Sequence, residues 1–470
     1  MRTILIVAIA LSFATSLWAQ GAGGSTATNT SGAVKVDGGF DLRAREENLN
    51  NIPMVTGTGP GTHQDYLRIR TRVWGSLEGN DLGAYARLAN EWRTYWAPSH
   101  ANLKNFNWPD ETLVDNLYLD VKNLFGGCVD LRIGRQDLMY GAGRVILDGT
   151  PGDGSRTLFF DAAKAVIRID KENTLDVLGI YNNPHAGLTT GSDPNHDLTQ
   201  ISGKQYKGMP GNDLIESGAG LVWGNKSCKN CPIETYFFWK HESDWHTWNP
   251  TFTAYTKVRG RDVYTLGSRA TPKFNDEFSG DVEAAVQYNQ TRDNREFMAG
   301  MGYAGLTWQP ALQSSWRPYA KLACYYLSGE GGNDPQTGKG WDPLWARYPQ
   351  LSELYVLAYN GQYGVGYWSN LLFPHAEVGV NIGPMHKLFA YSGPMLAPVK
   401  DGPDDGSLRG WLTVARYEFP LLLPSADASG PFGRRLAVFG HLQAEFLTPG
   451  DYYAEKSMAY FLRWELNVKF

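Results

Sequence analysis

Apolar and polar residues alternate along the last stretch of the chain, from Met458 to Phe470. Every second residue from Met458 onward is apolar or aromatic, and the residues between them are polar, with Phe461 as the main exception. A period of two is typical of a β-strand that has one apolar and one polar face. The pattern therefore predicts that the chain ends in a half-buried strand.

Stretches of the same kind recur through the chain, and eighteen of them can be counted. In the second stretch, Arg68, Arg70 and Arg72 alternate with apolar residues. The predicted strands span 34–45, 65–78, 82–96, 113–124, 128–137, 156–169, 173–182, 216–224, 232–240, 261–270, 278–290, 295–308, 316–328, 369–382, 385–396, 408–419, 433–446 and 457–470.

The connections between these stretches alternate in length. Tight turns lie at 79–81, 125–127, 170–172 and 383–384, and long links rich in Gly, Pro, Asn and Asp lie at 46–64, 97–112, 138–155, 183–215, 241–260 and 329–368. Outer-membrane barrels have short periplasmic turns and long external loops. The sequence therefore predicts an all-β fold, a single transmembrane antiparallel β-barrel of about 18 strands. Its last strand resembles the closing strand of Gram-negative outer-membrane barrels.

The N-terminal residues predict export from the cytoplasm. A basic residue, an apolar run from Ile4 to Phe13 and a small residue near position 20 are typical of a secretory signal peptide. We assign 1–19 to the signal peptide, 20–33 to a flexible leader and 34–470 to the barrel. The chain has no other apolar run of the roughly 20 residues that a spanning helix needs. We therefore expect a protein of the Gram-negative outer membrane, surrounded by its lipid.

The composition supports a barrel with one polar face and one apolar face. The mean hydropathy of −0.36, the 13% of aromatic residues and the 53 glycines are unusual for a helical membrane protein. The net charge of −5 excludes little. We expect a monomer, and no binding of nucleic acid, because the basic residues belong to the face that must line the lumen.

A charged side chain that faces lipid destabilises a barrel, since Lys or Arg at the bilayer midplane raises the free energy by roughly 2–4 kcal/mol. The parity that carries the arginines of the second stretch is therefore expected to face the lumen. One interpretation is a wall of cross-strand ion pairs that stiffens a polar interior. The other is an electropositive constriction that selects anions. The candidate pore cations are Lys35, Arg68, Arg70, Arg72, Arg132, Arg135, Lys164 and Arg168.

One region resembles the alginate export family of outer-membrane barrels. It contains a Gly-Arg-Gln strand end, a Tyr-Gly pair followed by Arg, and a Phe-Asp strand start, which here are Gly134, Arg135, Gln136, Tyr140, Gly141, Arg144 and Asp161. Ala162 stands where the family has Gly, and Lys164 stands at or near its usual Arg. Simple alternation would point Arg135 at lipid, so a bulge or a position at the rim is required there.

The resemblance implies an eighteen-stranded barrel whose pore passes an anionic polysaccharide outward, with possible periplasmic export partners. It also implies that Arg135, Lys164, Lys35 and one of Arg68 or Arg70 are pore cations. A general or substrate-specific uptake porin for small nutrients is the alternative within the same fold. Less favoured are an outer-membrane enzyme and a soluble carbohydrate-binding β-sandwich.

Few residues suggest other chemistry. Cys228 and Cys231 form a CxxC motif in a predicted periplasmic turn, where a local disulfide is favoured over a redox pair or half of a zinc site. We find no nucleophile motif, phosphate loop or metal-ligand set. The sequence therefore predicts neither catalysis nor a cofactor.

Overall fold

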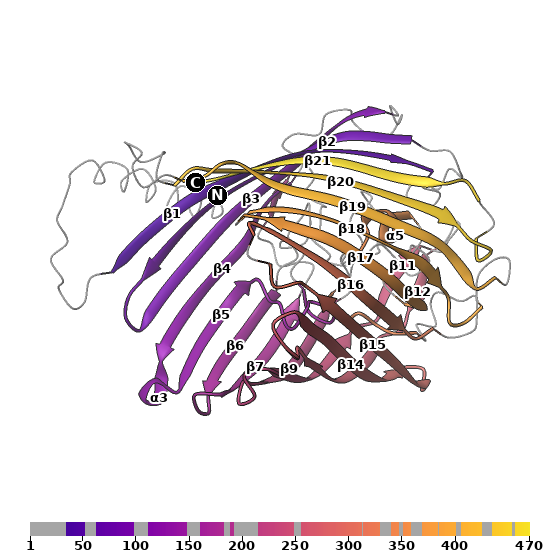
Figure 1. Ribbon diagram of the computed structural model, residues 1–470. Coiled ribbons are helices and arrows are strands. Elements are labelled where there is room, and N and C mark those ends of the chain that lie inside the picture. The colour runs from indigo at the N-terminus through magenta and orange to yellow at the C-terminus, as the bar shows by residue number, and fades with distance from the viewer. Residues whose placement is uncertain are drawn as a thin grey trace.

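The barrel closes between its first and last strands. The computed structural model describes residues 34–51, 63–97, 111–147, 160–182, 189–191, 215–248, 255–312, 314–329, 340–346, 351–358, 369–383, 385–400, 406–424, 435–453 and 456–470. Strand β1 (Lys35–Asn50) pairs antiparallel with β2 (His63–Glu78) on one side and with β21 (Ala459–Lys469) on the other. Main-chain hydrogen bonds of 2.9 and 3.0 Å between Phe40 and Phe470 end this seam. Figure 1 shows the C-terminus at that end of the molecule.

Eighteen strands of the described residues form the ring, each antiparallel to the next. The strands between β2 and β21 are β3 (Leu82–Ala97), β4 (Glu111–Asn123), β5 (Val129–Gln136), β6 (Phe160–Arg168), β7 (Asn173–Asn182), β9 (Glu216–Asn225), β10 (Ile233–Glu242), β13 (Arg261–Ala270), β14 (Phe278–Thr291), β15 (Glu296–Trp308), β16 (Trp316–Leu327), β17 (Leu371–Ile382), β18 (His386–Leu396), β19 (Leu408–Leu422) and β20 (Ala437–Pro449). Each predicted stretch overlaps one of these strands, which confirms the predicted fold class.

Several smaller elements were not predicted. The short strand β8 (Thr189–Gly191) pairs with β4, and β11 (Trp245–Trp248) and β12 (Tyr255–Val258) form a separate hairpin. The helices among the described residues are α3 (Leu124–Gly127), a single turn between β4 and β5, and α5 (Glu353–Ala358). The predicted signal peptide and leader lie outside the described residues.

No helix in the described part of the chain is long and apolar enough to cross a membrane.

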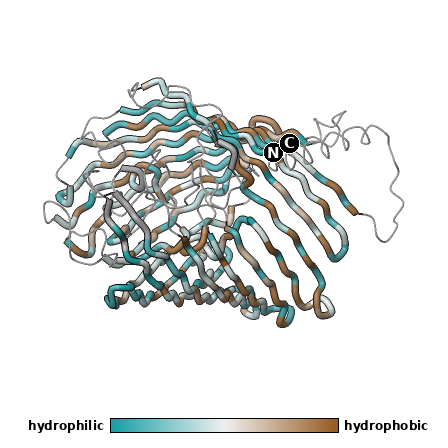
Figure 2. The backbone as a smooth tube through the Cα atoms, turned by 180° about the vertical axis from the view of Figure 1, so that it is seen from behind, coloured by the Kyte–Doolittle hydropathy of each residue, from teal (hydrophilic) through white to brown (hydrophobic). Residues whose placement is uncertain are grey.

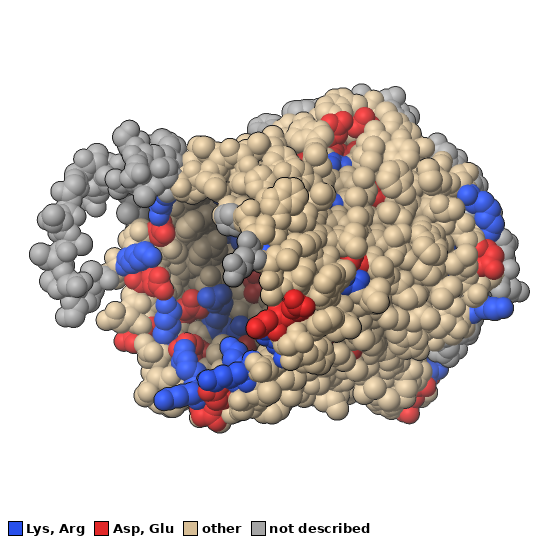
Figure 3. All heavy atoms as spheres, in the orientation of Figure 1, with Lys and Arg blue, Asp and Glu red and all other residues tan. Residues whose placement is uncertain are grey.

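The two faces of the strands differ in polarity as the alternation predicts. Figure 2 shows hydrophilic and hydrophobic positions alternating along the strands, and Figure 3 shows an outer wall that is nearly free of charge beside a hollow end lined by charged groups. Large exposed hydrophobic residues on the outer face include Val73, Leu77, Leu117, Leu119, Leu266, Val286, Leu306, Leu322 and Val378. Because lipid offers no hydrogen bonds, this arrangement keeps charges and backbone groups paired inside the protein.

Aromatic residues near strand ends divide between the two faces. Trp96, Trp308 and Trp316 are exposed on the outer wall, where indole rings suit the membrane interface. Tyr95, which also lies near a strand end, is buried instead and packs against Tyr66 with ring centroids 5.2 Å apart. The register explains the difference, because Tyr95 pairs with Tyr66 on the luminal parity.

Candidate functional site

A segment between β5 and β6 folds into the barrel and crosses part of the lumen. We call residues 137–147 the first inward segment. Asp137 accepts a hydrogen bond of 3.0 Å from the guanidinium of Arg87 on β3. The Tyr140 hydroxyl donates to Asp176 on β7 at 2.7 Å, and Arg144 donates to Glu283 on β14 at 2.5 Å. These contacts tie the segment to three separated parts of the wall.

Local sequence allows the first inward segment to turn. Gly141 and Gly143 have φ angles of 57° and 74°, a conformation that favours glycine. Burial, together with the hydrogen bond to Asp176, raises the pKa of Tyr140, so its hydroxyl stays a proton donor. Burial by itself lowers the pKa of Arg144, but the charges of neighbouring carboxylates outweigh burial and raise the pKa. Both anchors therefore keep their protons over the physiological range.

The link between β16 and β17 supplies a second inward segment, which the structure describes at residues 340–346 and 351–358. Asp342 is fully buried and contacts Arg261 on β13, and its backbone N–H donates to Gln287 on β14 at 2.9 Å. Trp345 packs edge-on against Phe160 of β6, with ring centroids 6.4 Å apart. The segment is therefore docked on several strands through both charge and aromatic contacts.

Helix α5 anchors the second inward segment on the opposite wall. The carboxylate of Glu445 on β20 accepts hydrogen bonds from Ser352 Oγ at 2.6 Å and from the backbone N–H groups of Glu353 and Leu354 at 3.1 and 3.0 Å. A carboxylate at a helix N-terminus satisfies N–H groups that would otherwise lack acceptors. This contact fixes α5 to β20 inside the ring of strands (Figure 1).

The strands β1 and β2 carry a cluster that we call the arginine wall, made of Arg43, Arg45, Arg68, Arg70 and Arg72. The register sets like charges opposite each other, Arg43 facing Arg70 and Arg45 facing Arg68. Directly opposed like charges destabilise a sheet. Buried carboxylates offset this repulsion, since Glu47 contacts Arg45 at 3.1 Å and Arg68 at 2.9 Å. The sheet therefore holds concentrated positive charge at one level of the lumen.

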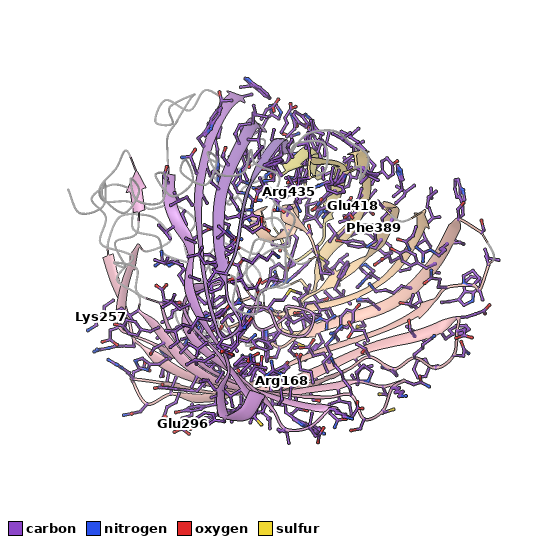
Figure 4. The ribbon with its side chains drawn as sticks, turned by 90° about the vertical axis from the view of Figure 1, so that its left-hand side faces the viewer. Arg168, Lys257, Glu296, Phe389, Glu418 and Arg435 are labelled. Atoms are coloured by element: carbon purple, nitrogen blue, oxygen red, sulfur yellow. The ribbon has the colours of Figure 1, made fainter. Side chains whose placement is uncertain are left out.

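A cavity of about 790 Å³ lies between the first inward segment and this wall. Asp137, Leu138 and Met139 bound it on one side. Strands β16 to β21 complete its lining. Figure 4 shows Glu418 and Phe389 inside the ring, with Lys257 and Glu296 at its outer edge. Its charged lining consists of seven cations and four acids, namely Arg43, Arg70, Arg72, Arg317, Lys387, Arg416, Lys469, Asp41, Asp137, Glu418 and Glu465.

The predicted pore cations occupy three kinds of position. Arg68, Arg70 and Arg72 belong to the arginine wall, and Arg70 and Arg72 also line the cavity. Arg132 lies on the luminal face but makes two hydrogen bonds to Asp120, and Lys164 lies 3.4 Å from Asp176. Lys35 and Arg168 lie at exposed strand ends on the side of the short turns, where Arg168 contacts Asp130.

Arg135 lies outside the luminal set. It pairs in register with Leu117, an exposed residue of the outer face, and its guanidinium makes two hydrogen bonds to Asp161 and one to the carbonyl of Val114. A bulge is present on the neighbouring strand β4, in its pairing with β3, and beyond it β4 pairs with β8. Gly134, with a φ of 125°, sits beside it. Arg135 therefore joins β4 to β6 where the regular ladder ends.

Replacing Arg135 by Ala is expected to lower the free energy of unfolding by about 1–3 kcal/mol, because the Asp161 carboxylate and the Val114 carbonyl lose their donor. Urea titration of the refolded barrel in detergent measures this change. Arg168→Ala is the matched control, since it removes an exposed ion pair and should change the midpoint little. Equal midpoints for both variants would contradict a structural role for Arg135.

The CxxC cysteines are free thiols in the structure. The disulfide predicted between Cys228 and Cys231 is therefore not formed. The turn is instead closed by a main-chain hydrogen bond of 3.0 Å from the N–H of Cys231 to the carbonyl of Cys228, so its shape does not depend on a covalent link.

Sequence reasoning missed both inward segments and the cations of the later strands that line the cavity. A signal for the second segment was present, because Trp341, Leu344, Trp345, Leu354 and Tyr355 are large apolar residues in a link expected to be solvated. All five are buried in the structure. For the first segment, the Tyr-Gly and Arg positions were noticed only as family motif residues, and their anchoring role comes from the contacts.

Solved structures with the same architecture come from Pseudomonas aeruginosa. OccK5 (OpdH) matches with a TM-score of 0.50 at 8% identity, over 92% of this chain and 97% of that chain. OccK8 (OprE) matches with a TM-score of 0.50 at 10% identity, over 93% and 98% of the two chains. OpdK, solved with vanillate, also gives a TM-score of 0.50 at 10% identity, over 92% and 98%.

This chain has the fold of an outer-membrane β-barrel. At such low identities the likeness establishes the architecture alone. Neither a protein-family model nor a curated protein sequence matches the chain, so the comparisons give no support to the resemblance to the alginate export family.

Proposed function

We propose that the barrel is a passive channel for small anionic solutes, with its selectivity set at the arginine wall. The observation that carries this proposal is the cavity in which seven cations outnumber four acids. A narrow space with excess positive charge concentrates anions and disfavours cations. Guanidinium groups bind carboxylates through paired hydrogen bonds, so small carboxylates are the favoured substrate class.

The inward segments favour small solutes over a polymer. The first segment reaches from Arg87 on β3 to Glu283 on β14, and an isolated β-bridge between Ile146 and Trp345 joins it to the second. Together they occupy part of the bore that a polysaccharide would have to thread. A precedent within this fold is OpdK, whose structure was solved with vanillate, a small carboxylate. Uptake of small nutrients is therefore favoured over export.

Export of an anionic polysaccharide is the second candidate. It is favoured by the similarity of the segment from Gly134 to Asp161 to the alginate export family and by the basic lumen. Export would require periplasmic partners and displacement of both inward segments.

A planar-bilayer measurement on the refolded full chain tests the proposal. Under a gradient of KCl, the reversal potential is expected to correspond to a preference for chloride over potassium. In proteoliposomes, small carboxylates are expected to permeate, whereas an oligomeric uronate is not. A cation-selective channel would contradict the anion proposal, and rapid entry of the oligomer would favour export.

A further inference from the structure

Helix α5 is connected to the arginine wall through a buried ion pair. Glu353 on α5 accepts a hydrogen bond of 3.2 Å from Nη1 of Arg463 on β21. The other terminal nitrogen of Arg463 contacts Glu47 on β1. The side chains of Arg463 and Glu47 are each 1% exposed, so water screens this contact little.

Glu47 divides one negative charge among three guanidinium groups. Its Oε1 lies 3.1 Å from Arg45 and also contacts Arg463, and its Oε2 accepts a hydrogen bond of 2.9 Å from Arg68. A change in how tightly Arg463 is held elsewhere must therefore change how tightly Glu47 holds Arg45 and Arg68.

The same sharing continues toward the cavity. Arg68 also donates to Glu91 on β3 at 3.1 Å, and Glu91 lies 3.7 Å from Arg43. Arg43 lines the cavity, whereas Glu353, Arg463 and Glu47 do not. Alternating charges thus run without a break from the second inward segment to a cavity cation.

We propose that Glu353 is a positioning residue for selectivity, which sets the charge presented by the arginine wall through Arg463 and Glu47. This inference rests on the proposed anion channel. Because Glu353 shares Arg463 with Glu47, it weakens the hold of Arg463 on Glu47, and Glu47 binds Arg45 and Arg68 more tightly. When Glu353 is lost, Arg463 draws on Glu47, Arg68 turns to Glu91, and Arg43 is held less tightly. The docking of α5 and the anion preference of the pore are therefore coupled.

The experiment measures the ratio of anion to cation permeability from reversal potentials of the full chain in planar bilayers. Glu353→Gln is expected to raise this ratio about twofold, as for a fraction of one charge freed at the wall. Arg463→Gln is expected to lower it, because Glu47 then holds Arg68 more tightly. The double variant is expected to have the same permeability ratio as Arg463→Gln alone, because Glu353 acts through Arg463.

Three outcomes separate this inference from its alternatives. Glu353→Gln could raise the permeability ratio by the same factor in the wild type and in Arg463→Gln. The charge of Glu353 would then act directly across the lumen, and coupling through Arg463 and Glu47 would be refuted. Ser352→Ala removes a hydrogen bond between α5 and Glu445 but keeps the ion pair of Glu353 with Arg463. If this variant raised the permeability ratio as much as Glu353→Gln, the effect would come from movement of the helix, and the proposed coupling would also be refuted. A wild-type channel without anion preference would instead refute the proposed function itself.

Discussion

Replacing Arg70 and Arg72 together by glutamine is expected to lower the anion-to-cation permeability ratio about tenfold or more. A unit charge 4 Å from a permeating ion contributes about 1 kcal/mol in water, which corresponds to roughly fivefold per arginine. Both side chains line the cavity beside the first inward segment, where a solute must pass close to them. Glutamine keeps much of the side-chain volume and polarity, so the measured change reports charge. Reversal potentials in planar bilayers give the ratio directly.

Arg132→Gln is the matched control for this double variant. Arg132 is also a luminal arginine, but Asp120 accepts two hydrogen bonds from it at 2.7 and 2.9 Å, and it does not line the cavity. Its removal is therefore expected to leave the permeability ratio nearly unchanged. If Arg132→Gln lowered the ratio as much as the double variant, selectivity would arise from the overall charge of the lumen and not from the arginine wall.

Replacing Asp342 by Ala is expected to increase single-channel conductance several-fold. Asp342 is fully buried, contacts Arg261 and accepts a hydrogen bond from the N–H of Leu344 at 2.6 Å. Arg261 keeps a second carboxylate, Glu242 at 2.7 Å, but the Leu344 N–H loses its acceptor and the second inward segment loses its ion pair with the wall, at a cost of about 1–3 kcal/mol. Such a loss shifts the second inward segment toward an undocked position. Conductance histograms at fixed salt measure the result.

An exposed ion pair supplies the control for Asp342. Asp293 contacts Arg295 at 2.8 Å in the turn between β14 and β15, where both side chains are exposed. Asp293→Asn is expected to leave conductance unchanged, since exposed pairs contribute little. Heat-modifiable gel migration shows whether the Asp342→Ala barrel is folded. If the folded variant had unaltered conductance, the second inward segment would not limit ion flow.

The strands could be predicted from the sequence because a barrel wall imposes a strict period of two. Val73 and Leu77 had to face lipid and Arg72 the lumen, and any other register would place charge in hydrocarbon. The arginine wall followed from the same parity. Its concentration at one level required the pairing register between β1 and β2, which one strand alone does not reveal.

The inward segments could not be predicted in the same way. Their positions depend on contacts between residues far apart in the sequence, such as Arg144 with Glu283 and Asp342 with Arg261. No local periodicity encodes such pairs. Arg135 is a different case: a motif suggested a pore cation, and only the structure reveals its hydrogen bonds to Asp161 and to the Val114 carbonyl.

In the proposed channel, the opposed arginines of β1 and β2 would make the attraction of anions depend on the salt concentration of the medium. Electrostatic influence reaches about 30 Å at 0.01 M salt but only about 3 Å at 1 M. In fresh water the wall would gather scarce anions from well beyond the cavity. At high salt the same residues would act only on solutes in direct contact with them, and the channel would select solutes mainly by size.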